Sequence, residues 1–226
     1  MIIENNIRTE IVEQCKKMYK NGLIQGTGGN VSVRLNSSFL ITPSGMNYIT
    51  METSDIVEMN FEGNIVSGDR TPSIEKEMHR YILNARKDIN AVVHTHSIYA
   101  TAVATTRQGI PPITDNQVVI FGGEIPVSKY ATIGTTALAE NVTKALANKK
   151  GVLMANHGIV AVGCTLEEAV FNAEMIEMFA HIYILSSQIG KGIPFTEEEI
   201  TKEHEDITKR YGQKSNRKEK KDGKNI

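Results

Sequence analysis

The 226-residue chain has few cysteines, almost no net charge and no long apolar run. Its two cysteines, Cys15 and Cys164, lie far apart without CxxC spacing, which argues against a disulfide framework and favours a reducing compartment. The formal net charge of -1 gives no general attraction for nucleic acid. No apolar stretch approaches the roughly 20 residues of a membrane span, and the opening MIIENN lacks the basic start of a signal peptide. We therefore expect a soluble, cytoplasmic protein that binds neither nucleic acid nor membranes.

Nucleotide-binding motifs are also missing. The glycine-rich stretch GTGGN lacks the Gly-Lys-Ser/Thr ending of a P-loop, and it precedes an expected strand where a P-loop would precede a helix. The chain contains no dinucleotide fingerprint either. We therefore do not expect ATP or a dinucleotide as a ligand.

The spacing of apolar residues predicts helices and strands in irregular alternation. Helices are expected at 7–18, 73–86, 97–106 and 165–189, and strand material at 31–35, 38–45, 89–96, 123–130 and 151–163. The length suits one sizeable core. We expect a single domain over 1–212, of mixed α/β class, with a central, mostly antiparallel sheet covered by helices. Residues 213–226 carry six Lys or Arg against two acids and are expected to form a disordered basic tail.

The stretch AVVHTHS places two histidines one residue apart at the end of an apolar run. Residues i and i+2 of a strand project from the same face, so His94 and His96 can aim their rings at one point. A metal ion suits such a pair, but zinc usually takes three or four ligands. The alternative interpretation is a pair of ordinary strand histidines, so further ligands are needed.

Two other residues can complete a metal site. His157, in MANHGIVAVG, follows an apolar run and sits beside Gly158, whose missing side chain leaves room for a ligand. Glu75 lies near the start of a helix that Ser73 can cap, where the helix dipole alone explains an acidic residue. Beside three histidines, however, a glutamate can act as a base, as a fourth ligand, or as both in turn.

Small residues in three segments can bind a phosphate group. The GTGGN stretch, Ser44-Gly45, and Ser73 with the Ile74 amide offer N–H and hydroxyl groups of the kind that form an anion-binding nest. Each segment taken separately is more often a plain turn, because glycine and serine are favoured in turns for backbone reasons.

Five motifs in order, GTGGNVSVR, ITPSGMNY, PSIEKEMH, AVVHTHS and ANHGIVAVG, resemble the class II aldolase and adducin family. The branch they resemble most is that of the L-fuculose-1-phosphate aldolases, and the resemblance extends from the first helix to about Tyr211. It implies the fold of that family and a homotetramer with active sites at subunit interfaces. It also implies a zinc ion bound by His94, His96 and His157. Imidazole and carboxylate ligands accept manganese and cobalt as well.

The same resemblance assigns roles to further residues. It implies that Glu75 is catalytic and also reaches the metal, and that Tyr211 matches a second, C-terminal tyrosine of the family. The residues implied to hold the substrate phosphate are Gly29, Asn30, Ser44, Gly45, Ser73 and Ile74. The chain departs from the pattern at Ile74, where the fuculose enzymes often have a serine, and around Asp115 and Asn116, where a tyrosine supplied to a neighbouring subunit has no counterpart.

The function implied is reversible cleavage of a ketose 1-phosphate, L-fuculose 1-phosphate in the first instance, to dihydroxyacetone phosphate and L-lactaldehyde. Alternatives within the family are a 5-deoxyribulose-1-phosphate aldolase, a sugar-phosphate dehydratase and a ribulose-phosphate 4-epimerase. In the epimerases an aspartate usually replaces the glutamate, so Glu75 favours the aldolase. A non-enzymatic, adducin-like interaction module would lack the complete metal site.

Overall fold

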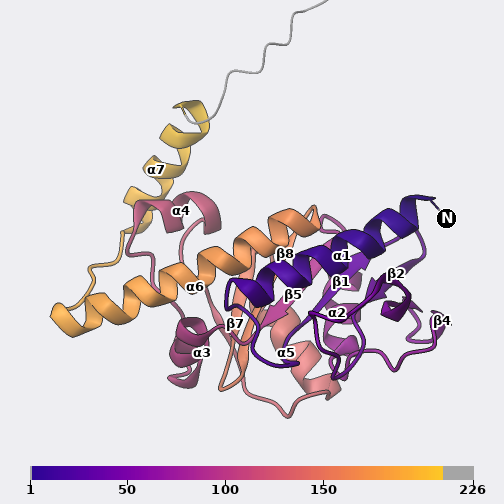
Figure 1. Cartoon of the computed structure of the whole chain (residues 1–226). Helices are drawn as coiled ribbons and strands as arrows, with labels where there is room; N and C mark the ends of the chain where they lie inside the picture. The colour runs from indigo at the N-terminus through magenta and orange to yellow at the C-terminus, as the bar shows by residue number, and fades with distance from the viewer. Residues whose placement is uncertain (1, 211–226) are drawn as a thin grey trace, which may run out of the picture.

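The computed structural model describes residues 2–210 and shows an eight-stranded sheet between two layers of helices (Figure 1). The strands are β1 (Asn30–Arg34), β2 (Ser38–Ile41), β3 (Val57–Asn60), β4 (Ile65–Ser67), β5 (Ala91–Thr95), β6 (Val127–Ser128), β7 (Gly151–Met154) and β8 (Gly158–Gly163). Their order in the sheet is β4-β3-β2-β1-β5-β8-β7-β6. All neighbours are antiparallel except β6 and β7. The expected mixed α/β class with a mostly antiparallel sheet is confirmed.

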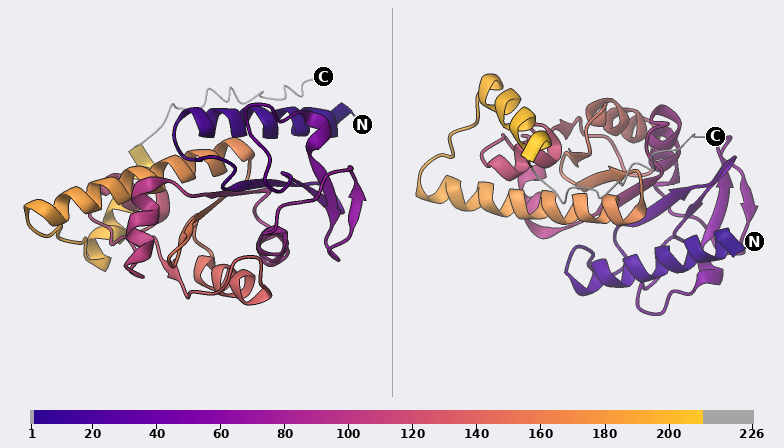
Figure 2. Two further views of the ribbon diagram at one scale, coloured as in Figure 1. Left: turned by 60° about the horizontal axis from the view of Figure 1, so that its bottom comes forward. Right: turned by 90° about the horizontal axis from the view of Figure 1, so that it is seen from above.

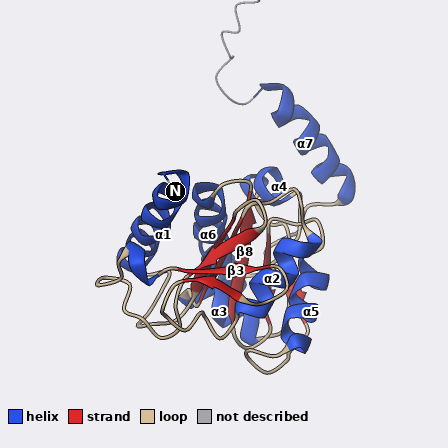
Figure 3. Ribbon diagram, turned by 90° about the vertical axis from the view of Figure 1, so that its right-hand side faces the viewer, coloured by secondary structure: helices blue, strands red, loops and turns tan. Residues whose placement is uncertain are grey.

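The helices pack on both faces of this sheet. They are α1 (Ile2–Lys20), α2 (Lys76–Ala85), α3 (Ile98–Thr105), α4 (Asp115–Phe121), α5 (Thr136–Leu146), α6 (Leu166–Ile189) and α7 (Glu197–Arg210), with a short 3-10 helix η1 (Thr53–Asp55). Helices α1 and α6 cover one face, and α2 and α5 cover the other (Figures 2 and 3). Helix α7 contacts α4 and extends away from the sheet.

The two faces enclose two separate hydrophobic cores, because side chains alternate along each strand. Val93 of β5 packs into the core beneath α1 and α6. Its neighbour Val92 packs into the core beneath α2 and α5, together with Val160 of β8. Because His94 is two residues beyond Val92, the alternation places its side chain on the α2 and α5 face of the sheet.

Two predicted elements begin or divide differently in the structure. The stretch 151–163 forms two antiparallel strands, β7 and β8, and His157 lies in the turn that joins them. The helix expected from Ser73 begins at Lys76, with Glu75 at the N-cap position. The Ser73 hydroxyl instead accepts the backbone N–H of Glu75 at 3.2 Å, which forms a turn before the helix.

Strands β3 and β4 and helices α4, α5 and α7 were not predicted from the sequence. For two of the helices a local signal was present. Thr114 and Thr135 cap α4 and α5 by accepting the N–H groups of Gln117 and Leu138. No helix within residues 2–210 is long and apolar enough to cross a membrane. The expected basic tail at 213–226 and Tyr211 lie outside the described residues.

The two cysteines lie in different environments. Cys15 of α1 is fully buried in the core beneath that helix, whereas Cys164 is exposed immediately after β8. Since His157 precedes β8 and Cys164 follows it, the strand separates the two residues along its whole length.

Candidate metal centre

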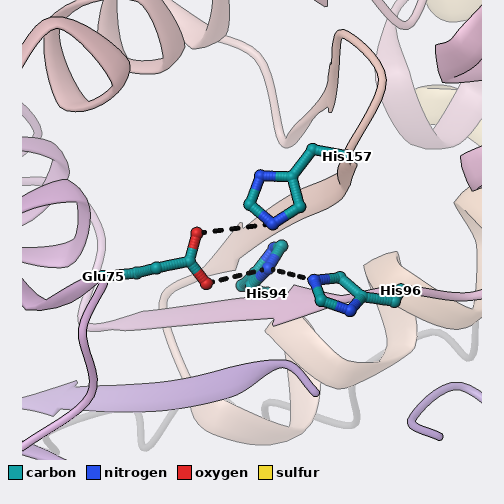
Figure 4. A group of neighbouring side chains, drawn as sticks. All are labelled: Glu75, His94, His96 and His157. Atoms are coloured by element: carbon teal, nitrogen blue, oxygen red, sulfur yellow. Dashed lines mark hydrogen bonds and ion pairs between the residues drawn. The ribbon is translucent and has the colours of Figure 1, made fainter. Parts of the chain in front are cut away.

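The side chains of Glu75, His94, His96 and His157 converge on one point (Figure 4). One ligand atom from each residue lies within 4.8 Å of the others. His94 is in the central strand β5, and His96 follows directly after that strand. Glu75 precedes α2, and His157 lies in the β7–β8 turn. Four residues that are up to 82 positions apart thus meet at one end of the central strands.

The strand register brings the histidines together. In the antiparallel pairing of β5 with β8, His94 faces Val160 and Thr95 faces Ile159. His157 lies just before β8, so the register puts its turn beside the end of β5, where His96 follows. The geometry therefore depends on the sheet more than on the local sequence around each histidine.

Gly158 is needed because the histidine rings occupy the space beside it. A Cβ atom on Gly158 would lie 2.9 Å from Cδ2 of His96 and 3.3 Å from Cε1 of His94, and it would also collide with the carbonyl of Thr95. The expected room beside this glycine is thus filled by the rings of the other two histidines. An alanine here would have to push the rings away from the point on which they converge.

The β7–β8 turn is held in place by Asn156, a residue that the sequence analysis did not single out. Asn156 adopts a left-handed backbone conformation with φ of 58°, which asparagine tolerates better than most residues. Its N–H donates to the carbonyl of Ala104 at 3.1 Å, and its side-chain oxygen accepts from Nε of Arg107 at 2.7 Å. The Asn-His-Gly sequence is a turn signal that could have revealed this role.

The hydrogen bonds of the cluster leave several electron-rich atoms facing one another. Nε2 of His94 lies 2.9 Å from Nε2 of His96 and 3.1 Å from Oε2 of Glu75. The buried Oε1 of Glu75 and Nε2 of His157, 3.6 Å apart, have no hydrogen-bond partner within the described residues. Such buried atoms are costly unless a cation or proton joins them. Three imidazole nitrogens and one carboxylate oxygen form a donor set typical of zinc and similar divalent ions, so these residues fit a metal.

The charges of the cluster shift the pKa values of its members. Burial alone would raise the pKa of Glu75, but His94, His157 and the Asn30 amide outweigh it and hold that pKa well below its usual range. Burial would lower the pKa of His94, but the Glu75 carboxylate outweighs burial and raises it. Burial and the charge of His94 lower the pKa of His96 and of His157 to about 4. Of the three histidines at the cluster, His94 is therefore the one whose protonated form is favoured.

One side of the cluster is accessible from solvent. Glu75 and His94 are buried, whereas His96 and His157 are only partly buried. The cluster is therefore closest to solvent on the side of His96 and His157. A catalytic metal needs such an open side, because one coordination position has to remain for substrate.

The three segments predicted to bind phosphate lie side by side in the structure. The N–H of Thr42 donates to the carbonyl of Val31, which joins the segment of Ser44 to that of Asn30. The N–H groups of Ser44 and Ser73 donate to the carbonyls of Thr71 and Thr42, at 2.9 and 3.1 Å. These bonds hold the segments together, and they also engage two of the N–H groups that a phosphate would otherwise use.

The individual residues of this region differ in what they offer. Gly29 and Gly45 both have positive φ, at 78° and 65°. A Cβ atom on Gly29 would lie 2.6 Å from the carbonyl oxygen of His94, so the loop approaches the metal cluster closely. The Ile74 side chain is 56% exposed, and Asn30 has its side chain engaged with Glu75 instead of free for a phosphate.

Comparisons with known proteins extend these observations. Residues 9–184 match the family model described as "Class II Aldolase and Adducin N-terminal domain". The chain is 38% identical over 197 residues to the L-fuculose phosphate aldolase of Escherichia coli (strain K12), covering 87% of this chain and 91% of the relative. It is 37% identical over 207 residues to the 5-deoxy-D-ribulose 1-phosphate aldolase of Bacillus thuringiensis serovar kurstaki, covering 90% and 94%. A solved structure described as L-fuculose 1-phosphate aldolase superposes with a TM-score of 0.86 at 36% identity, covering 90% of this chain and 96% of the other.

Proposed function

The chain belongs to the class II aldolase and adducin family, and from this membership we propose that it is a metal-dependent aldolase. The reaction is the reversible cleavage of a ketose 1-phosphate to dihydroxyacetone phosphate and a small aldehyde. The observation that carries the proposal is the convergence of three histidines with a glutamate that keeps one carboxylate oxygen unpartnered. An adducin-like interaction module would not need this complete set of ligands.

Glu75, His94, His96 and His157 would hold the metal, and zinc is the ion we propose. A bound divalent ion supplies Lewis-acid stabilisation of the negative charge that develops on the ketose half when the carbon-carbon bond breaks. Glu75 moves the proton at the nucleophilic carbon of that half. Its Oε2 is held by Asn30 at 2.9 Å, so the unpartnered Oε1 is the oxygen that accepts the proton.

The phosphate of the substrate binds in the adjoining loops. We assign this role to Gly29, Gly45, Ser44, Ser73 and Ile74. Because the N–H groups of Ser44 and Ser73 already donate to backbone carbonyls, the phosphate relies on the hydroxyls of these two serines and the N–H groups of Gly29, Gly45 and Ile74. Ile74 can offer only its backbone, since its side chain is apolar.

Two ketose 1-phosphate substrates have support from the relatives. L-fuculose 1-phosphate is the first candidate, because the chain is 38% identical to an L-fuculose phosphate aldolase. 5-Deoxyribulose 1-phosphate is the second, because the chain is 37% identical to a 5-deoxy-D-ribulose 1-phosphate aldolase. Both reactions release dihydroxyacetone phosphate, so they need the same metal ligands, the same base and the same phosphate site.

An assay with purified, metal-loaded protein tests the proposal. L-Fuculose 1-phosphate and 5-deoxyribulose 1-phosphate are offered separately, and release of dihydroxyacetone phosphate is followed with a coupled dehydrogenase. L-Ribulose 5-phosphate, whose phosphate would stay on the aldehyde half, is tested for epimerisation instead. We expect release from at least one ketose 1-phosphate. The one with the higher kcat/KM is then the better candidate for the physiological substrate. Absence of cleavage with both ketose 1-phosphates, in protein shown to bind one equivalent of metal, would contradict an aldolase.

We further propose that the protein forms a homotetramer with sites shared between subunits, as the family resemblance implies. Light scattering measures the mass directly. A monomer of 25.0 kDa that is fully active would contradict this part of the proposal.

A further inference from the structure

Three buried polar side chains form a hydrogen-bonded chain that ends on the carboxylate of Glu75. The hydroxyl of Ser32 lies 2.6 Å from Nδ1 of His79, and Nε2 of His79 lies 2.5 Å from Oδ1 of Asn30. The Asn30 amide then donates to Oε2 of Glu75 at 2.9 Å. Ser32 and His79 have no exposed surface, and Asn30 is 4% exposed.

Each link of this chain has only one chemically consistent direction. An ionised carboxylate only accepts hydrogen bonds, so the NH₂ group of Asn30 faces Glu75 and its oxygen faces His79. Nε2 of His79 must therefore carry a hydrogen. The ring is buried between an amide oxygen and a hydroxyl, neither of which could balance a positive charge, so His79 is neutral. Its bare Nδ1 accepts the Ser32 hydroxyl hydrogen, and this bond fixes the tautomer that Asn30 requires.

The fold brings these groups together from two elements. Asn30 and Ser32 are two residues apart on β1 and so project from the same face of the sheet. Helix α2 packs on that face through Met78 and Ile82. His79 follows Glu75 by one helical turn, and its own backbone N–H bonds to the Glu75 carbonyl. The N-terminal end of α2 therefore carries both Glu75, on which the hydrogen-bonded chain ends, and His79, its central residue.

We propose that the chain Ser32–His79–Asn30 positions Glu75 for proton transfer, with His79 as the positioning residue on which it depends. The inference rests on the proposed function, because it concerns the same carboxylate. Asn30 donates to Oε2, which also lies 3.1 Å from Nε2 of His94, so Oε1 is the oxygen without a hydrogen-bond partner. Without His79 the Asn30 amide can rotate, and Oε2 then loses its hydrogen bond from Asn30 and keeps only its contact with Nε2 of His94.

Two substitutions of His79 separate this role from simple packing. His79→Met introduces an apolar side chain of similar size, which fills the space of the ring but offers no donor to Asn30. His79→Gln restores an N–H group close to the position of Nε2. His181→Met serves as a matched control, since His181 lies on α6, on the opposite face of the sheet, and its ring stacks on Tyr99.

We expect His79→Met to lower kcat by about 10–100-fold, the usual loss when a group that orients a metal ligand is removed. KM for the ketose phosphate should change little, because the phosphate contacts are untouched. His79→Gln should recover most of the activity, and His181→Met should behave like the parent. A folded His79→Met protein with unchanged kcat, or a His79→Gln protein as slow as His79→Met, overturns the inference.

A double substitution tests whether His79 acts through Asn30. If it does, Asn30→Ala combined with His79→Met loses no more activity than Asn30→Ala alone. Additive losses of activity would instead show that Asn30 and His79 act independently, and would contradict a hydrogen-bonded chain in which His79 acts through Asn30. If His79→Met does not fold, as judged by circular dichroism, Ser32→Ala replaces it in the same comparison, because it keeps the ring and removes only the hydroxyl that fixes its tautomer.

Metal binding gives a readout that does not depend on activity. Cobalt is bound to each variant, its visible absorption is recorded, and its affinity is measured by competition with a chelator. We expect altered absorption and about tenfold weaker binding in His79→Met, with recovery in His79→Gln. Parent-like cobalt spectra and affinities in both variants would count against the inference. If the parent protein binds cobalt but cleaves no ketose phosphate, the proposed function fails, while the cobalt comparison still decides the positioning role.

Discussion

Nδ1 of His94 donates its hydrogen to the backbone carbonyl of Ile159 at 2.8 Å, a bond that joins the two central strands β5 and β8. This bond assigns the tautomer of His94 and turns its Nε2 lone pair toward the other ligands. An outer hydrogen bond of this kind is the usual partner of a metal-binding histidine. Without a metal, the same Nε2 can hold a proton next to Glu75.

Metal binding should therefore release a proton from His94. Its pKa is raised above the ordinary value, whereas His96 and His157, with pKa values of about 4, are already neutral at pH 7. We expect up to one proton released per zinc between pH 6 and 7, declining as the pH rises through the pKa of His94. Calorimetry in buffers with different ionisation enthalpies measures this number. Release of two or more protons at pH 7 would contradict the conclusion that His96 and His157 are neutral at that pH.

Gly158→Ala should weaken metal binding by at least about tenfold, because its Cβ would displace the rings of His94 and His96. Competition with a chelator measures the affinity. Gly190→Ala is the control, since a Cβ atom there meets nothing within 4 Å. Equal affinities in the two variants would show that the rings can move aside without leaving the site.

Glu75→Gln should lower kcat by about 10²–10⁴-fold, the contribution typical of a positioned general base. Glu77→Gln, two residues along on α2, should retain activity because that carboxylate pairs with Arg80 instead of joining the cluster. Steady-state kinetics, on protein with a measured metal content, gives kcat for both variants. Only a few-fold loss in Glu75→Gln with the metal retained would exclude Glu75 as the base.

Acid should destabilise the metal-free protein partly through His79. Burial and the charge of His94 lower the pKa of His79 to about 3, against an ordinary value of 6.5 in the unfolded chain. Between these pH values the unfolded state binds a proton that the folded state does not, so the free energy of unfolding falls as the pH falls. One such residue removes up to about 1.4 kcal/mol per pH unit. In chelator, urea unfolding at pH 7, 6, 5 and 4 should show a shallower dependence for His79→Gln than for the parent. An equal dependence of the free energy of unfolding on pH in both proteins would contradict the low pKa of His79.

The metal ligands could be proposed from the sequence because short-range patterns mark them. The i, i+2 spacing of His94 and His96 needs only the period of a strand, and Gly158 marks the crowded position beside His157. The family and the fold class were also predicted and are confirmed. That the three histidines meet is a property of the β5–β8 register, and Glu75 joins them from the start of α2; no local pattern states either.

The hydrogen-bonded chain behind Glu75 could not be predicted in the same way. The spacing of Asn30 and Ser32 places them on one face of β1, and His79 follows Glu75 by one helical turn. Nothing in these spacings says that α2 lies over that face of the sheet. The resemblance predicts phosphate binding for Asn30, and the structure adds two partners of its side chain, Glu75 and His79, that no sequence pattern indicated.

The separation of Cys164 from the metal centre makes this protein suitable for attachment to a surface. Strand β8 has six residues, which at about 3.3 Å per residue puts roughly 20 Å between the exposed thiol and the turn of His157. Cys15 is fully buried, and burial raises the pKa of its thiol, so a maleimide at neutral pH should couple at Cys164 alone. The tether would leave from the opposite end of the sheet, with the opening beside His96 and His157 still facing the solution.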